Sequence, residues 1–231
     1  MQKYCSTRKI ISVTIFVDIL VLGSALLIAA LLNQNPEKHF AESGYITWFS
    51  FLKILAASYL AWKIFQTRKS IARVNSWFPS YNLWAILSFG FLFLGLDEIL
   101  KIHENLDILI HDFFQICETA ITDRIDSLIV FAYALIGINI LFWAKSELKK
   151  FKPAFSLFSI AFALTLVMIF LDLLTDTHDF VYWLFDNHDL AHTVHSSLGI
   201  AEECFKVFAA GMFLAAFLRC LQISQRFKKS L

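Results

Sequence analysis

Residues 153–174 read PAFSLFSIAFALTLVMIFLDLL, an apolar run in which Asp172 is the single charged side chain. As an α-helix this run would be about 33 Å long, which is close to the thickness of the hydrocarbon core of a bilayer, about 30 Å. A strand of a membrane barrel would instead alternate apolar and polar residues. The stretch therefore predicts a transmembrane helix.

Five more apolar runs of similar length follow the same pattern. Together the six runs predict an all-α, polytopic membrane helical bundle with six transmembrane helices. We expect a single integral membrane domain over residues 1–231, without a second domain. The expected spans are residues 10–32, 44–65, 83–102, 127–144, 153–174 and 198–221.

The composition agrees with a membrane protein. Hydrophobic residues make up 58% of the chain and charged residues only 17%, whereas a soluble domain has about 45–50% and about 25%. The net charge of +1 excludes the basic excess of a nucleic-acid-binding protein, and four cysteines are too few for a disulfide scaffold.

The charged residues are divided between the two sides of the predicted bundle. Of 20 Lys and Arg residues, 15 lie at the termini or in the second and fourth connections. By the positive-inside rule this places both termini in the cytoplasm and favours a bacterial inner (plasma) membrane. All seven histidines and 17 of 19 acidic residues then fall on the outer side.

One candidate site segment runs out of the third span, from Leu94 to Asp112, with the sequence LGLDEILKIHENLDILIHD. A continuous helix would place Asp97, Glu104 and His111 on one stripe and Glu98 beside them. Carboxylates in an apolar span are costly unless they face a cavity, a cation or a partner. The alternative is that the span ends earlier and these acids are solvated.

A second candidate segment surrounds the last outer connection. Residues 187–206, NHDLAHTVHSSLGIAEECFK, would present His188, His192, His195 and Glu202 on one helical face. A His-x-x-x-His pair can hold one metal ion, and Asp172 lies at the outer end of the preceding span. The alternative is a hydrated, amphipathic segment at the membrane interface.

We expect these segments to meet in one cavity. The favoured hypothesis is a metal-dependent membrane hydrolase that acts on a lipid or lipid-linked substrate, with a divalent ion, Zn or else Fe or Mn, as cofactor. The expected metal ligands are Asp97, His111, Asp172, His188, His192 and His195, and the expected general bases are Glu98, Glu104 and Glu202.

Two alternatives stay open. The same acids could form the path of a cation- or proton-coupled transporter, or the acidic outer surface could belong to a non-catalytic membrane protein that binds a partner or senses ions. No nucleic acid is expected as a partner.

Three charged residues lie inside the predicted spans. Asp18 and Lys53 are near the middle of the first and second spans and are expected to pair with each other. Lys206 lies one helical turn below Glu202 and is expected to neutralise one of the neighbouring glutamates.

Overall fold

The computed structural model describes residues 6–41, 44–72, 79–115, 125–175, 178–185 and 187–229. This part of the chain is all-helical and contains no strand, which confirms the all-α part of the prediction. The elements are α1 (Thr7–Leu31), α2 (Glu37–Phe40), α3 (Tyr45–Ile71), α4 (Asn82–Leu100), α5 (Ile102–Phe114), α6 (Ile125–Trp143), α7 (Lys145–Leu148), the 3-10 turn η2 (Lys149–Phe151), α8 (Lys152–Thr175), α9 (His178–Leu184) and α10 (His188–Lys229).

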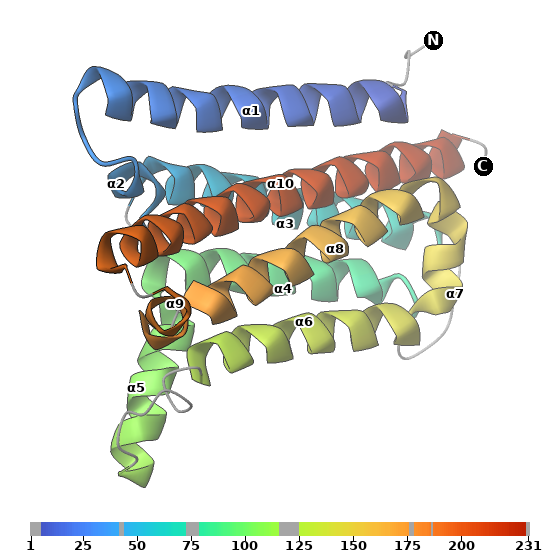
Figure 1. The fold of residues 1–231 in the computed structure, drawn as a ribbon. Coiled ribbons are helices and arrows are strands. Elements are labelled where there is room, and N and C mark those ends of the chain that lie inside the picture. The colour runs from blue at the N-terminus through green and yellow to red at the C-terminus, as the bar shows by residue number, and fades with distance from the viewer. Residues whose placement is uncertain are drawn as a thin grey trace.

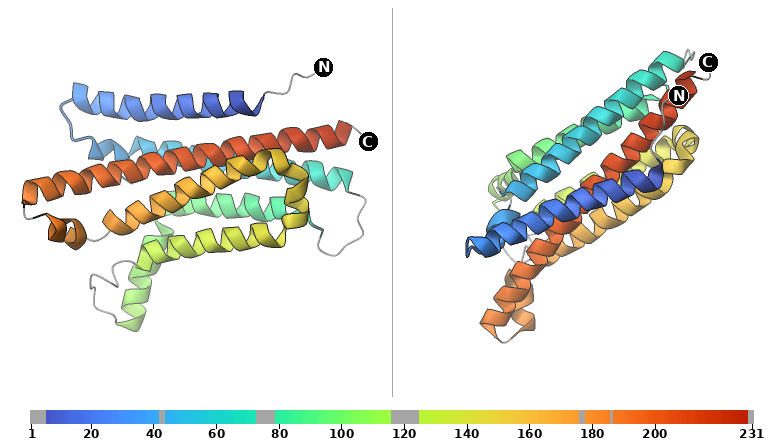
Figure 2. Two further views of the ribbon diagram at one scale, coloured as in Figure 1. Left: turned by 45° about the vertical axis from the view of Figure 1, so that its right-hand side comes forward. Right: turned by 90° about the horizontal axis from the view of Figure 1, so that it is seen from above.

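The long helices α1, α3, α4, α6, α8 and α10 run side by side along one axis (Figure 1). Each predicted apolar run falls within one of them, apart from one or two residues at some ends. The short helices α2 and α9 lie at one end of the bundle, where α10 begins, and α7 lies at the other end, where α1 begins and α10 ends (Figures 1 and 2).

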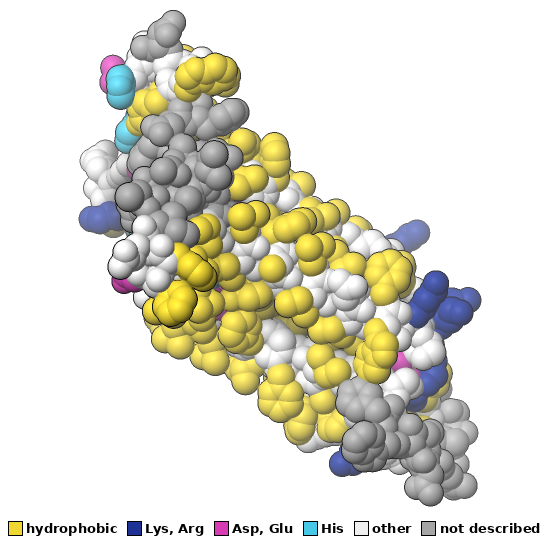
Figure 3. Space-filling model, turned by 90° about the horizontal axis from the view of Figure 1, so that it is seen from below, with side chains coloured by type: hydrophobic (Ala, Val, Ile, Leu, Met, Phe, Trp, Pro, Cys, Tyr) yellow, Lys and Arg dark blue, Asp and Glu magenta, His cyan; other side chains and the backbone are white. Residues whose placement is uncertain are grey.

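Within the residues that the structure describes, five helical segments are long and apolar enough to cross a membrane, judged by length and composition. A sixth apolar helix, Leu128–Trp143 within α6, is shorter. Apolar side chains form a broad band over the lower face of the molecule, between an end that bears histidine and an end that bears most of the visible Lys and Arg (Figure 3).

Helix α10 is the centre of the packing. It lies against α1, α3 and α8, and α3 in turn packs on α4. Phe217 of α10 is fully buried and meets the rings of Phe91 and Phe158 edge-on, with centroids 5.0 and 5.3 Å apart. Buried alanines on α3, α8 and α10 let the helix backbones approach closely, as small residues do between membrane helices.

The predicted pairing of Asp18 with Lys53 is confirmed. Lys53 Nζ of α3 donates to Asp18 Oδ1 of α1 at 2.7 Å and to the carbonyl oxygen of Val207 on α10 at 2.5 Å. The ammonium group thereby joins three helices inside the bundle. Gly211 makes room for it, because a Cβ at this position would lie 2.8 Å from Lys53 Nζ and closer still to the Asp18 carboxylate.

A second buried charge cluster closes the end of the bundle near α7. Glu147 of α7 is fully buried and accepts hydrogen bonds from Arg68 Nε at 2.7 Å, Lys150 Nζ at 2.5 Å and Ser80 Oγ at 3.2 Å. One carboxylate therefore fixes α3, the start of α4 and the turn before α8. The loop position of Glu147 in the sequence did not indicate this role.

The prediction of one continuous helix through Leu94–Asp112 is wrong. Lys101 adopts a left-handed conformation, with φ 52° and ψ 48°, which ends α4 at Leu100 and starts α5 at Ile102. Helix α5 then turns away from the long helices (Figure 1). It exposes the large apolar side chains Ile108, Leu109, Phe113 and Phe114.

Candidate functional site

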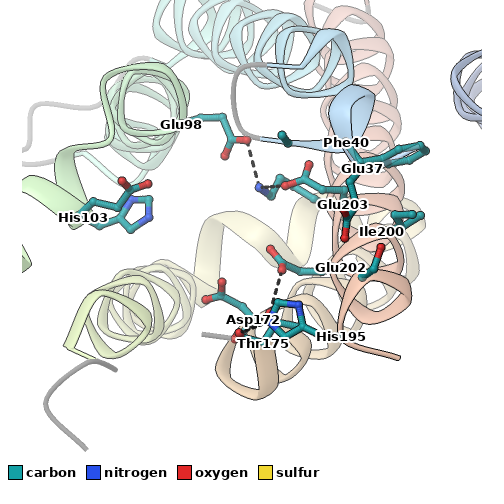
Figure 4. A pocket seen from close by; sticks show the side chains of 15 residues that line it. Glu37, Phe40, Glu98, His103, Asp172, Thr175, His195, Ile200, Glu202 and Glu203 are labelled. Atoms are coloured by element: carbon teal, nitrogen blue, oxygen red, sulfur yellow. Dashed lines mark hydrogen bonds and ion pairs between the residues drawn. The ribbon is translucent and has the colours of Figure 1, made fainter. Parts of the chain in front are cut away.

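A polar cavity of about 320 Å³ lies at the end of the bundle where α10 begins. Figure 4 shows acidic side chains of α4, α8 and α10 that point toward the space between these helices. Helix α2 and the start of α5 complete the wall. We call it the polar cavity; its lining residues include Glu37, Phe40, Glu98, His103, Glu104, Asp172, Thr175, His195, Ile200, Glu202, Glu203 and Lys206.

An apolar chamber of about 210 Å³ continues from this cavity into the bundle. Its walls are side chains of α4, α6, α8 and α10, among them Leu141, Phe162 and Phe213. On α10 the chamber extends from Glu202 to Phe217, about 22 Å along the helix. The cavity and the chamber share five residues, namely Glu98, His103, Asp172, Glu202 and Lys206.

The break at Lys101 creates a pair between Asp97 and His103. The backbone N–H of His103 donates to Asp97 Oδ1 and the ring Nδ1 lies 2.9 Å from Asp97 Oδ2. Because an ionised carboxylate only accepts hydrogen bonds, Nδ1 carries the proton and Nε2 is left with the lone pair. Asp97 thus also caps the first turn of α5.

The electrostatic surroundings favour the charged form of this histidine. The hydrogen bond to Asp97 is the largest influence and raises the pKa of His103, burial opposes it, and the charges of Glu104 and Asp126 raise it further. Asp97 itself is only 5% exposed and contacts both the backbone N–H and the ring of His103, so its carboxyl group is held beside the ring. A carboxylate that orients an imidazole through Nδ1 is the arrangement used in acid–base catalysis.

Lys206 of α10 links the two sides of the polar cavity. Its ammonium group donates to Glu203 Oε1 at 2.6 Å and to Glu98 Oε1 of α4 at 3.2 Å (Figure 4). The expectation that Lys206 neutralises a neighbouring glutamate is confirmed, since Lys206 contacts Glu203. It also contacts Glu98 on α4. Glu203 was not among the predicted site residues.

The opposite wall is formed by the end of α8 and by α10. Thr175 Oγ1 donates to Glu202 Oε2 at 3.4 Å, and His195 Nε2 donates to the carbonyl oxygen of Thr175 at 3.0 Å. That carbonyl bond fixes the proton of His195 on Nε2. Asp172, one turn before Thr175, lines both the polar cavity and the apolar chamber.

Six of the nine predicted site residues lie around these spaces. Glu98, Glu104, Asp172, His195 and Glu202 line the polar cavity, and Asp97 lines the apolar chamber. His103 lines both spaces, but the sequence indicated only that it is one of the histidines on the outer side. No sequence signal pointed to it, because Lys101 is neither Gly nor Asn, the residues that usually adopt a left-handed conformation.

The other three predicted residues lie elsewhere. His188 and His192 are exposed in the first turns of α10, and His188 packs against Tyr182, with ring centroids 4.9 Å apart. His111 is bound to Asp107 Oδ1 at 2.9 Å near the end of α5. For His188 the physical reason is distance along the helix, since the 14 residues from His188 to Glu202 rise about 21 Å even though the two residues share a face. For His111 the reason is the turn at Lys101, which directs α5 away from the long helices.

Among the residues that the structure describes, no three His, Cys, Asp or Glu side chains are placed so that they could hold one metal ion. Helices α4, α8 and α10 bring carboxylate and imidazole side chains to one cavity, but these side chains are not positioned to coordinate a single ion. What the cavity does present is an oriented imidazole, a shared lysine and several carboxylates.

A family model described as Domain of unknown function (DUF8692) matches residues 12–221 of the chain. The match covers α3, α4, α6 and α8 in full, most of α1 and α10, and the residues that line both cavities. No curated protein and no solved structure matches the chain.

Proposed function

Because the chain belongs to the family described as DUF8692, whose description assigns no activity, we propose a function from the geometry of its cavities. The protein is an integral membrane hydrolase that binds a lipid or lipid-linked substrate at the outer membrane interface. The polar end of the substrate occupies the polar cavity and its tail occupies the apolar chamber.

The proposal includes six spans with both termini in the cytoplasm of a bacterial cell. Helix α6, with 19 residues, would be about 28 Å long, and this nearly equals the hydrocarbon thickness. Its axis follows that of the other long helices (Figure 1). The basic residues of α3, α7 and α10 lie toward the end where α1 begins, which supports a cytoplasmic orientation for that end.

The observation that carries the proposal is the shared boundary between the two spaces. A charged mouth that opens into an apolar chamber between transmembrane helices fits a molecule with one polar and one apolar end. An ion path would instead need polar groups across the whole bundle. Below the shared residues, the described lining of the chamber is almost entirely apolar, which favours a lipid over a transported ion.

His103 is the proposed general base. In the neutral ring, Nε2 would take a proton from water as the water oxygen attacks the scissile carbonyl or phosphoryl group, and would return that proton to the departing oxygen or nitrogen. Asp97 positions the ring and stabilises its protonated form. Lys206 would offer its positive charge to the oxyanion that develops during attack.

The three glutamates predicted as general bases do not accept the proton in this scheme and instead bind or orient other groups. Glu98 is already paired with Lys206, and Glu104 is paired with Lys101 at 3.2 Å. Glu202 accepts from Thr175 and faces the cavity from the opposite wall (Figure 4). Glu202 is therefore the carboxylate best placed to orient the attacking water.

A divalent metal ion is the second candidate for activating water, as the sequence predicted. Asp172, His195 and Glu202 line the same cavity from neighbouring helices, and carboxylate with imidazole suits Zn, Fe or Mn. These side chains would have to move together before they could bind one ion. Acid–base chemistry by His103 needs no such movement and is the version we favour.

The test is lipid turnover by purified protein in proteoliposomes made from a bacterial lipid extract, followed by mass spectrometry. We expect one lipid to be consumed by the wild type and its consumption to fall by about 10²-fold or more in His103→Gln and Asp97→Asn. His188→Gln is the matched control, because its ring lies outside both spaces. Unchanged turnover in folded His103→Gln would refute the acid–base role, and no consumption by any form would refute the hydrolase.

A further inference from the structure

Helix α6 carries a polar side chain on the surface that faces away from the bundle. Asn139 is the only asparagine or glutamine in the six predicted spans, and it is exposed. It lies four residues, about 6 Å, before Trp143 at the proposed cytoplasmic end of α6. Because helical side chains lean toward the N-terminus of their helix, the amide group is directed toward the membrane midplane and away from the nearer aqueous boundary.

The amide group of Asn139 is only partly satisfied. Its Nδ2 donates to the carbonyl oxygen of Leu135 on the same helix at 2.8 Å. Within the part of the chain that the structure describes, its second N–H and its Oδ1 form no hydrogen bond. A carboxamide has two donor hydrogens and an acceptor oxygen, and hydrocarbon offers no partner for them. A second helix that supplies both a donor and an acceptor would satisfy this group.

The residues around Asn139 form a seam of the kind that joins two paired helices. Five exposed side chains follow one another at spacings of four, three, four and three residues, which is the a and d pattern of a coiled coil. Asn139 falls on an a position, where a single asparagine specifies the register and the number of helices. The seam is about 21 Å long. It consists of Leu128, Ala132, Leu135, Asn139 and Phe142.

The packing of α6 within its own chain leaves this seam uncovered. Among the side chains of α6 that the structure describes, none is fully buried, whereas each of the other long helices buries several. Helix α6 lies at the lower side of the bundle in Figure 1, and a broad apolar band covers the lower face in Figure 3. The other face of α6 lines the apolar chamber with Val130, Tyr133, Ala134, Gly137 and Leu141.

We propose that α6 pairs with α6 of a second copy of this chain, which forms a two-fold dimer in the membrane. Two copies inserted in the same direction hold Asn139 at the same depth, so each amide donates to the other and accepts from it. A two-fold interface brings the same residues together from both sides, and a carboxamide is complementary to itself. A different membrane protein would need its own polar residue at that depth.

The dimer also supports the apolar chamber from outside, because the paired helix forms one of the chamber walls. The proposal depends on the transmembrane position of α6. It does not depend on the hydrolase reaction.

The dimer is measured with the full chain in liposomes, by single-molecule photobleaching over a range of protein-to-lipid ratios. We expect a fraction of two-copy complexes that rises with this ratio, without larger assemblies. Asn139→Leu should raise the dissociation constant about tenfold, since it removes the hydrogen bonds between the helices and keeps an apolar seam. Asn139→Gln retains a carboxamide and should retain most of the affinity.

Ser159→Leu is the matched control. Ser159 is an exposed polar residue of α8, and its hydroxyl donates to the carbonyl oxygen of Phe155 on its own helix. The single donor hydrogen of the serine is thereby used, so Ser159→Leu should leave the dissociation constant unchanged.

Photochemical cross-linking locates the contact. The photoreactive residue p-benzoylphenylalanine replaces either Phe142 of the seam or Phe155 of α8, which are 71% and 61% exposed. We expect two copies to become cross-linked from position 142 and not from position 155.

Several results would overturn the proposal. Single copies at every protein-to-lipid ratio would refute the dimer, and equal dissociation constants for Asn139→Leu and Ser159→Leu would refute the role of the amide. Equal cross-linking from positions 142 and 155 would refute α6 as the contact. Cross-linking from position 142 only to a different protein in the native membrane would assign the seam to that partner. None of these measurements uses lipid turnover, so a failure of the dimer is distinguished from a failure of the proposed hydrolase.

Discussion

Lys53 Nζ lies 2.7 Å from Asp18 Oδ1, and the two side chains are only 7% and 1% exposed. The contact joins α1, which otherwise packs loosely at the edge of the bundle, to α3. A charge buried in this way is stabilised mainly by its partner, so the loss of one member leaves the other without compensation.

We therefore expect Lys53→Met or Asp18→Leu alone to lower the free energy of unfolding by about 3–5 kcal/mol. The double substitution should recover most of that loss, because an apolar pair suits the same site. Denaturant unfolding in nanodiscs measures all three variants. Additive effects of the two single substitutions would contradict the pairing.

Gly211 allows the close approach of α10 to this pair. Gly211→Ala should lower the free energy of unfolding by about 1–3 kcal/mol, since the added methyl group overlaps Asp18 and Lys53. Gly23→Ala is the matched control, because its added Cβ meets nothing within 4 Å. Equal stability of the two variants would show that α10 can shift to accommodate the methyl group.

The buried carboxylate of Glu147 should be the strongest link at the opposite end. Glu147→Gln leaves Arg68 partly unpaired, and we expect a loss of about 3–5 kcal/mol in unfolding free energy. Lys150→Gln removes the partner whose side chain is 43% exposed, so its cost should stay below about 1 kcal/mol. Thermal unfolding of both variants gives the comparison, and a larger cost for Lys150→Gln would argue against this ranking.

The docking of α5 should depend on pH through His103. Its pKa is raised in the folded protein, above all by the hydrogen bond to Asp97. The stabilisation is therefore complete below the unfolded pKa, about 6.5, and disappears as the pH rises through the folded value. Hydrogen exchange of the amides of α5 should thus quicken, beyond the intrinsic pH effect, above neutral pH in the wild type.

His103→Gln serves as the reference for that experiment. It should have less protected α5 amides than the wild type below about pH 6.5 and nearly equal protection at high pH. Asp97, Glu104 and Asp126 are the acidic groups whose interactions with this imidazole raise its pKa. If the difference in α5 amide protection between the wild type and His103→Gln increased with rising pH, the assignment of this pH dependence to His103 would be contradicted.

Metal analysis of purified protein distinguishes the two versions of the hydrolase. If a divalent ion activates water, Asp172→Asn and His195→Gln should each lower the amount of bound Zn, Fe or Mn. His188→Ala with His192→Ala should leave it unchanged, because both side chains are exposed and line neither space, and along α10 they lie about 21 Å and about 15 Å from Glu202. If only the variant with both His188→Ala and His192→Ala lost its metal, the His-x-x-x-His hypothesis would be supported instead.

Hydropathy predicted most of the bundle because the length and continuity of an apolar run depend on local sequence alone. The pairing of Asp18 with Lys53 was also predictable, since two opposite charges at similar depth have few other partners. The site was harder. A helical wheel shows which residues share a face, but His188 and Glu202 share a face without sharing a depth.

The most useful site residue, His103, depends on one backbone conformation. A straight helix would place it six residues, or 600°, from Asp97 and on a different face. The left-handed Lys101 reverses this and brings the ring back to the carboxylate. A lysine in that conformation is set by its tertiary surroundings, which local sequence does not encode.

The order of the helices along the chain also determines when the core of the bundle can form during synthesis, because α10 follows the helices on which it packs. Domains emerge from the ribosome with the N-terminus first, so Phe217 and Cys220, two fully buried core residues of α10, emerge after the helices on which α10 packs. The helices that precede α10 must therefore remain in the bilayer as partly assembled pairs until α10 is made. Contacts such as that between α3 and α4 stabilise these pairs. A nascent chain arrested before Phe217 would lack both its core and one wall of its cavity.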